Sequence, residues 1–165
     1  MRLLPKRIVD YVAEISHKGA EEITRASIRC VCGAKVFQMI YQGKLVKEFL
    51  GPNLITCDDD GLLTLAAVCC KCRTRIELFD RRTDGYSARI EETPRDRNWS
   101  REEKKYLCKK CGGQSFQVRV GLEYTGMEEL DGFPNPEDYY SWIWIDAICS
   151  NCGAHIQGLV DVETA

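Results

Sequence analysis

The chain has 165 residues, of which 44% are hydrophobic and 29% are charged, which excludes a disordered or a membrane-embedded composition. The formal net charge of −2 indicates no partner by itself, but the charges are unevenly distributed. Residues 71–110 carry 13 Lys or Arg against 8 Asp or Glu, whereas residues 111–165 carry 1 against 9. A basic middle beside an acidic end predicts two surfaces with different binding preferences.

Ten cysteines are unusual for an intracellular chain and must serve as disulfides, metal ligands or redox groups. Pro5, Lys6 and Arg7 interrupt the apolar start, so we expect no signal-peptide core, and no stretch approaches the ~20 apolar residues of a membrane span. We therefore expect a cytoplasmic protein, in which disulfides rarely persist. Cysteine pairs in such a protein indicate metal sites first.

The first predicted element is an amino-terminal helix within residues 1–27. Between residues 5 and 18, the apolar side chains of Ile8, Val9, Val12 and Ile15 follow a helical spacing.

Two copies of one pattern follow, over residues 28–90 and 106–165. When Cys32 is placed on Cys111, a glycine follows each cysteine and a Phe-Gln pair follows five residues later. The next cysteines also correspond after gaps of 36 and 37 residues, Cys69 and Cys72 with Cys149 and Cys152. Only two copies with a period of about 79 residues indicate a duplicated domain rather than a solenoid.

The sequence pattern in each copy predicts three strands. The first strand alternates apolar and polar residues, and its apolar face carries Phe37, Met39 and Tyr41 in one copy and Phe116, Val118 and Val120 in the other. A polar loop comes next, and a second strand, LLTLAAV or WIWIDAI, runs into the second cysteine pair. A third strand, TRIELFD or AHIQGLV, leaves that pair.

The cysteine spacing explains why these pairs suit zinc. In C-x-x-C-G, two intervening residues let both sulfurs face one point, and the glycine adopts backbone angles that a side chain would obstruct. The second copy fits fully, with Cys108, Cys111, Cys149 and Cys152 as predicted ligands of a structural Zn²⁺. A cytosolic redox dithiol is the alternative for such pairs.

The first copy departs from this spacing, because Arg29 stands where Cys108 stands in the second copy, and Cys30 supplies the sulfur one residue later. A C-x-C pair can still chelate one metal through a tighter turn. We therefore predict a second zinc site, whose ligands are Cys30, Cys32, Cys69 and Cys72. Cys57 or Cys70 could replace a ligand, and His155 could enter a rearranged second site.

Between the copies, residues 91–105 form a polar linker. Ser100 and Glu103 match a capping box, which predicts a short helix entering the second copy.

Two-knuckle, three-strand units of this kind resemble zinc ribbons over roughly residues 28–80 and 106–165. The resemblance rests on the cysteine pairs with Gly33, Gly112 and Gly153, and the first copy departs from it at Cys30 and Arg73. It implies a small, metal-stabilised, β-rich fold of two tandem zinc ribbons, each a three-stranded antiparallel sheet, preceded by the helix. Because zinc ribbons generally act as binding modules, the resemblance implies a binding function.

We predict no enzyme, because four cysteines leave zinc no open coordination position, and the sequence shows no phosphate-binding loop or nucleophile elbow. The leading hypothesis is an adaptor or regulator that binds another protein. In the acidic second copy, the side chains of Phe133, Tyr139 and Tyr140 could contact a basic partner. The following Trp142 and Trp144 could contribute or could instead cap the thin core.

The alternative hypothesis is binding of DNA or RNA through the basic stretch 71–110. Its arginines could neutralise phosphates, foremost Arg81, Arg82, Arg95 and Arg97. Interspersed glutamates and the acidic second copy argue against tight duplex binding. We expect no membrane contact and see no evident small-molecule substrate.

Overall fold

The fold consists almost entirely of antiparallel strands. The computed structural model describes residues 4–17, 23–90, 102–124 and 132–164. The elements in chain order are α1 (Lys6–Val9), β1 (Val12–His17), β2 (Ile23–Ile28), β3 (Phe37–Gln42), β4 (Lys44–Val46), β5 (Leu54–Thr56), β6 (Thr64–Cys69), β7 (Arg75–Asp80), α2 (Gly85–Ile90), β8 (Lys104–Lys105), β9 (Phe116–Glu123), a 3-10 turn (Pro136–Asp138), β10 (Trp142–Cys149) and β11 (His155–Glu163). None of the helices in these segments is long and apolar enough to cross a membrane.

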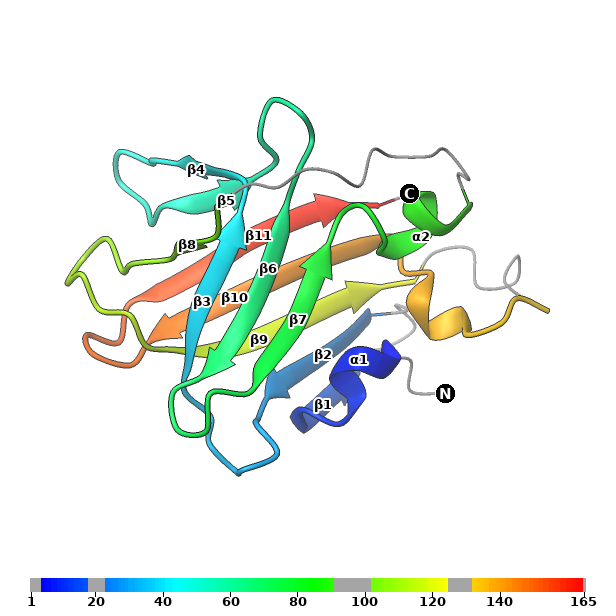
Figure 1. The fold of residues 1–165 in the computed structure, drawn as a ribbon, viewed down its shortest axis with the longest axis horizontal. Helices are drawn as coiled ribbons and strands as arrows, with labels where there is room; N and C mark the ends of the chain where they lie inside the picture. Colours follow the sequence, from blue (N-terminus) through cyan, green and yellow to red (C-terminus); the bar gives the residue numbers. More distant parts are fainter. Residues whose placement is uncertain (1–3, 18–22, 91–101, 125–131, 165) are drawn as a thin grey trace.

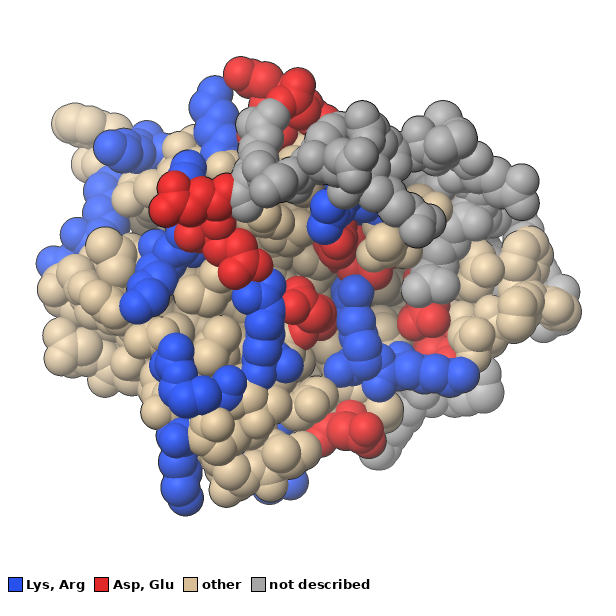
Figure 2. All heavy atoms as spheres, in the orientation of Figure 1, with Lys and Arg blue, Asp and Glu red and all other residues tan. Residues whose placement is uncertain are grey.

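Nine strands form one curled sheet with the path β1-β2-β9-β3-β6-β7, while β10 pairs with β9 and β11, and β8 lies beside β3. Strands β4 and β5 form a separate hairpin. Figure 1 shows that the curl places β3, β6 and β7 in front of β9, β10 and β11. Figure 2, in the same view, shows cationic and acidic side chains intermixed on the front face.

The predicted amino-terminal helix over residues 5–18 is wrong, because α1 is a single turn and the chain is extended over Val12–His17. The spacing of Ile8, Val9, Val12 and Ile15 does fit a helix. These side chains are all β-branched, however, and β-branched residues lose rotamer freedom in helices and are favoured in strands. Strand β2 supplies the backbone partners that β1 needs.

The three strands predicted in each copy are confirmed as β3, β6 and β7 and as β9, β10 and β11. Each set pairs antiparallel with its second strand in the middle. Strands β3, β9 and β10 alternate buried and more exposed residues over most of their length, as the period-2 pattern requires. Strand β6 is buried on both faces.

Strand β9 joins the two copies. One of its edges pairs with β10 along the full strand, and the other edge pairs with β2. That second edge also meets β3, where Phe116 lies opposite Phe37. The strands of both copies therefore share one hydrogen-bonded sheet.

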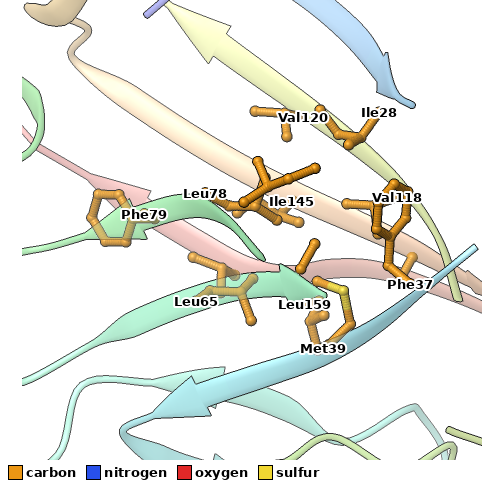
Figure 3. Packing of buried hydrophobic residues seen from close by; sticks show 14 of the residues in the cluster. Ile28, Phe37, Met39, Leu65, Leu78, Phe79, Val118, Val120, Ile145 and Leu159 are labelled. Carbon is orange, nitrogen blue, oxygen red and sulfur yellow. The ribbon is translucent and has the colours of Figure 1, made fainter. Parts of the chain in front are cut away.

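A single hydrophobic core lies between the two layers of the curled sheet. Figure 3 shows that residues of both layers point toward one another, with Phe37, Met39, Leu65 and Leu78 from one layer and Val118, Val120, Ile145 and Leu159 from the other. All eight are at most 2% exposed. Because each three-stranded unit alone has little apolar surface to bury, the shared core is the main source of stability.

Two segments depart from the expected loops. The polar loop predicted in the first copy, residues 51–61, contains strand β5, which forms a hairpin with β4 and lies against β11. The helix predicted before the second copy is wrong over residues 102–105, where β8 pairs with β3 instead. The cap residue Ser100 lies outside the described residues.

Candidate metal centres

The first cysteine group lies at one end of the β3-β6-β7 unit. Cys30 and Cys32 come from the turn between β2 and β3, Cys69 ends β6, and Cys72 lies in the turn before β7. The sulfurs of Cys30 and Cys72 are 3.3 Å apart, and those of Cys32 and Cys69 are 3.6 Å apart. All four Sγ atoms lie within 4.8 Å of one another.

The second group repeats this geometry in the other unit. Cys108 and Cys111 precede β9, Cys149 ends β10, and Cys152 lies in the turn before β11. The sulfurs of Cys108 and Cys152 and those of Cys111 and Cys149 are each 3.6 Å apart. These four Sγ atoms also lie within 4.8 Å of one another.

Both groups are positioned to bind metal ions. A tetrahedral thiolate site with metal–sulfur bonds of about 2.3 Å has sulfurs about 3.8 Å apart, so small shifts fit the observed pairs to one ion. All ten cysteines of the chain are free rather than joined in disulfides. Four thiolates in a tetrahedron suit soft ions, zinc or iron above all.

Three of the four cysteine turns share one backbone pattern. In the turn that starts at Cys149, the N–H of Cys149 donates to the carbonyl of Ala154, and the N–H of Gly153 donates to the carbonyl of Cys149, both at 2.9 Å. The turns that start at Cys108 and Cys69 repeat these two bonds at the same sequence spacing. The pattern aims both sulfurs of each turn to the same side.

The C-x-C turn of the first copy is a shortened version of that pattern. The N–H of Cys30 donates to the carbonyl of Ala34, and the N–H of Gly33 donates to the carbonyl of Cys30, both at 2.8 Å. Each bond spans one residue fewer than in the other turns. Removing one residue therefore preserves the turn and still places Cys30 and Cys32 in one group.

Arg73 occupies the position at which the other three turns have glycine. Its φ of 65° lies in the left-handed region, like the φ of 88° at Gly33, 71° at Gly112 and 74° at Gly153. A non-glycine residue pays roughly 1–2 kcal/mol for this conformation. The turn geometry is thus imposed on Arg73 by its surroundings rather than by its own preference.

Local hydrogen bonds lower the pKa of thiols in both groups. The side chain of Thr74, whose hydroxyl lies 3.1 Å from the sulfur, and the Thr74 N–H lower the pKa of Cys72 to about 6. The Asn151 side chain and the N–H of Gly113 likewise lower the pKa of Cys111 to about 6. Burial raises the pKa of Cys30 to about 12, so a bound metal ion has to displace its proton.

The two spare cysteines lie outside both groups. The guanidinium of Arg81 contacts the sulfur of Cys57, and the exposed Cys70 has its sulfur 3.9 Å from the hydroxyl of Ser115. His155, on β11, borders a surface hollow rather than joining the second group. The structure therefore brings together the eight predicted ligands without any of these substitutes.

The predicted aromatic contact surface is only partly at the surface. Phe133 is 40% exposed, and its ring packs on that of Tyr139 at 5.3 Å. The prediction is wrong for Tyr140, which is 1% exposed and packs edge-to-face on Tyr124 inside the core. Tyr140 lies two residues before β10, outside the alternation of that strand, and its ring packs inward on Tyr124.

Trp142 and Trp144 do not cap the core either. They alternate with the buried Ile143 and Ile145 and therefore lie on the opposite face of β10. Both tryptophans are partly exposed there.

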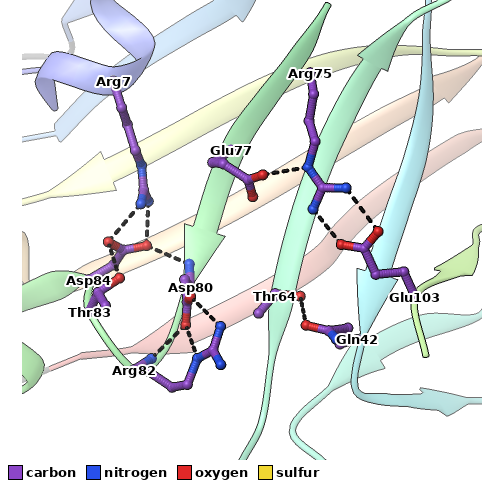
Figure 4. Close-up of polar contacts among 10 residues, drawn as sticks. All are labelled: Arg7, Gln42, Thr64, Arg75, Glu77, Asp80, Arg82, Thr83, Asp84 and Glu103. Atoms are coloured by element: carbon purple, nitrogen blue, oxygen red, sulfur yellow. Dashed lines mark hydrogen bonds and ion pairs between the residues drawn. The ribbon is translucent and has the colours of Figure 1, made fainter. Parts of the chain in front are cut away.

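The predicted nucleic-acid arginines are largely committed to internal contacts. Arg82 forms an ion pair with Asp80 at 2.7 Å, and Arg81 contacts Cys57. Nearby Arg75 bridges Glu77 and Glu103, as Figure 4 shows. Two further members of the set, Arg95 and Arg97, lie outside the described residues.

Two features of the surface were not predicted from the sequence. Phe49 and Leu50 lie at the β4–β5 tip and are 94% and 95% exposed; an apolar pair directly before Gly-Pro in a loop is a signal that could have found them. The second feature is the close approach of Trp144 to Gly121. A glycine inside a strand is a known sign of such contacts.

No family model matches this chain, and neither a curated protein nor a solved structure matches it. Its function therefore has to be inferred from its own geometry.

Proposed function

We propose that the chain is a non-enzymatic adaptor protein in which two structural Zn²⁺ ions each close one zinc ribbon. Support for the zinc ribbons comes from the two three-stranded units, each with two cysteine turns at one end. Support for zinc comes from the all-cysteine donor sets, which suit a structural tetrahedral ion. Four cysteines fill the coordination of such an ion, so neither site leaves a position for a substrate.

The observation that carries the adaptor role is the exposed tip of the β4–β5 hairpin. Phe49 and Leu50 are 94% and 95% exposed, although burial of such a side chain is worth roughly 1.5–3 kcal/mol. The tip is held in place, because the Lys109 ammonium donates to the backbone carbonyls of Glu48 and Gly51. Two apolar side chains fixed in solvent are typical of an anchor for a partner.

The proposal of an acidic protein as the partner is supported by the surroundings of the tip. A hollow of about 380 Å³ lies between the tip and the second cysteine group and is bordered by Phe49, Leu50, Lys109 and Lys110. The side chain of Lys47 is exposed directly before the tip. A partner that inserts an apolar residue into this hollow and surrounds it with carboxylates would match both the shape and the charge.

The experiment is affinity capture of the tagged full-length chain from its own cells, with and without nuclease. It compares the native chain with a double variant, Phe49→Ser with Leu50→Ser. The matched control is Val31→Ser, which alters another apolar residue that is 69% exposed but lies in the first cysteine turn. Because all three side chains are exposed, we expect every variant to fold.

We expect an acidic protein partner that survives nuclease, is retained by Val31→Ser and is lost with the double variant. A partner retained by the double variant would overturn the tip as the docking point. Recovery of nucleic acid alone would overturn the adaptor role.

A further inference from the structure

A second surface feature lies on the opposite face of the sheet from the core. Strands β1, β2, β9 and β10 border a hollow of about 390 Å³, within the ~300–1,000 Å³ range of small-molecule sites. It is separate from both cysteine groups and from the β4–β5 tip. The side chains around it combine an aromatic ring, two cations and two carboxylates: Trp144, Arg25, Arg119, Glu14 and Asp146.

The indole of Trp144 forms a flat platform in this hollow. Trp144 on β10 lies opposite Gly121 on β9, and its ring covers the glycine so closely that a Cβ there would lie 2.2 Å from ring atoms Cε2 and Nε1. Only glycine lets the ring lie across the strand in this way. One ring face lies toward Gly121, and the guanidinium of Arg25 lies over the ring. A planar group that stacks on the exposed ring surface therefore lies beside this guanidinium.

Two arginines flank the platform without a carboxylate partner. Arg25 lies opposite Gly121 on the other edge of β9, and its guanidinium carbon is 5.8 Å from the Trp144 ring centroid. Arg119 is exposed two residues before Gly121 on the same face. Within the described residues, neither arginine takes part in an ion pair with Asp or Glu. Arg119 is thus available to an anion, and Arg25, whose guanidinium lies over the indole, keeps its charge beside the same hollow.

The two carboxylates lie on the neighbouring row of the sheet. Asp146 lies opposite Arg119 on β10, and Glu14 lies opposite Ser27 of β2. One oxygen of Asp146 accepts a hydrogen bond from the N–H of Gly158 at 2.7 Å, which fixes the carboxylate in place. Its second oxygen can accept a further hydrogen bond from an amino group.

We propose that this hollow binds a nucleotide whose base carries an exocyclic amino group. The base stacks on Trp144, its amino group donates to Asp146 or Glu14, and the phosphate lies against Arg25 and Arg119. The same chemistry is offered by a free nucleotide and by one residue of a single strand. The site uses none of the arginines of the basic stretch and does not depend on the docking role of the tip.

The test measures binding to the full, metal-loaded chain. Calorimetry is done with AMP and UMP, and fluorescence anisotropy with labelled ten-residue oligoadenylate and oligouridylate. The test variants are Trp144→Ala, which removes the platform, and Arg119→Glu, which reverses one exposed charge. The matched controls are Trp142→Ala, on the same strand and face, and Lys35→Glu, an exposed cation elsewhere. Circular dichroism of Arg119→Glu verifies that this variant is folded.

We expect Trp144→Ala to lose about fivefold to 150-fold in affinity for adenine ligands, the range measured for one stacked base. Arg119→Glu should also lower the affinity, because it places a carboxylate against the phosphate, while both controls bind as the native chain does. Binding of AMP comparable to that of oligoadenylate identifies a free nucleotide as the ligand, and binding of the oligomer alone identifies a single strand. The proposal is overturned if no adenine ligand binds or if Arg119→Glu leaves affinity unchanged. Equal affinity for uracil ligands would overturn the role of the two carboxylates.

Discussion

Phe37 and Phe116, which occupy the same position in the two copies, lie directly opposite each other where β3 meets β9. Both side chains are fully buried. A residue that faces its own counterpart is the arrangement found across the axis of a two-fold symmetric dimer. Here the two copies that face each other belong to one chain. They are joined both by backbone pairing and by a common core.

The first prediction concerns this junction. Phe116→Ala removes a ring that also packs on Tyr106 at 5.5 Å, and we expect the free energy of unfolding to fall by about 3–5 kcal/mol. Because the core is shared, both copies should unfold in one transition, followed by circular dichroism in urea. The exposed Phe49→Ala is the control and should change stability by less than about 0.5 kcal/mol. Separate transitions for the two copies would contradict a shared core.

The second prediction concerns the metal. Cys152→Ser should lower the metal content from two ions per chain to one, measured by elemental analysis, because it removes one of four ligands in the second group. The loss should also lower the melting temperature of the whole chain, since β10 and β11 belong to the common sheet.

Cys70→Ser is the matched control for the metal content. Its sulfur lies outside both groups, so two ions should remain. If the Cys70 variant also lost an ion, the ligand assignment of the first group would be wrong.

Local patterns in the sequence were sufficient to predict six strands and to choose the eight clustered cysteines from ten. Two of these patterns are properties of short segments: the alternation of apolar residues along β3 and β9, and the spacing of the cysteines. Because the chain carries an internal repeat, each pattern in one copy could be compared with the same pattern in the other copy. The pairing of β9 with β2 was not predictable in this way, because it joins residues about 95 positions apart. The helical pattern around Val12 became a strand because β1 pairs with β2, the next strand along the chain, so periodicity within one segment failed where pairing with a second segment decided the structure.

The third prediction concerns Arg73. Arg73→Gly should raise the free energy of unfolding by about 0.5–1 kcal/mol, because glycine adopts a φ of 65° without strain but loses more backbone entropy on folding. Arg73→Ala is the control, since it removes the contact of the guanidinium with Gln38 and keeps the strained backbone. Urea unfolding of both variants makes the comparison. A glycine variant no more stable than the alanine variant would show that the turn carries no strain.

The fourth prediction concerns pH. A thiol whose pKa is lowered in the folded state, such as Cys72 at about 6, contributes stability that is complete above the pKa of an unfolded thiol, ~8.5, and is lost as the pH falls through 6. Thr74→Val removes the hydroxyl that helps lower this pKa, so protons should compete with the metal at higher pH. The midpoint of metal release from the first group should therefore rise, followed with a zinc indicator.

The second group is the internal control for this variant, because no part of Thr74 contacts the four cysteines between 108 and 152 in the described structure. Its release midpoint should not move. Equal shifts at both groups would point to a general loss of stability rather than to the Thr74 hydroxyl.

The fifth prediction concerns the tryptophan platform on β9. Gly121→Ala places a methyl group 2.2 Å from the Trp144 ring, a distance that real side chains cannot sustain, so the ring must move off the strand. We expect a cost of about 1–3 kcal/mol in the free energy of unfolding and a shift of the tryptophan emission spectrum. The control is Gly51→Ala, because a Cβ there meets its neighbours at an ordinary 3.5 Å. Unchanged emission and stability in Gly121→Ala would mean that the indole does not rest on the strand, and the stacking surface would then be absent.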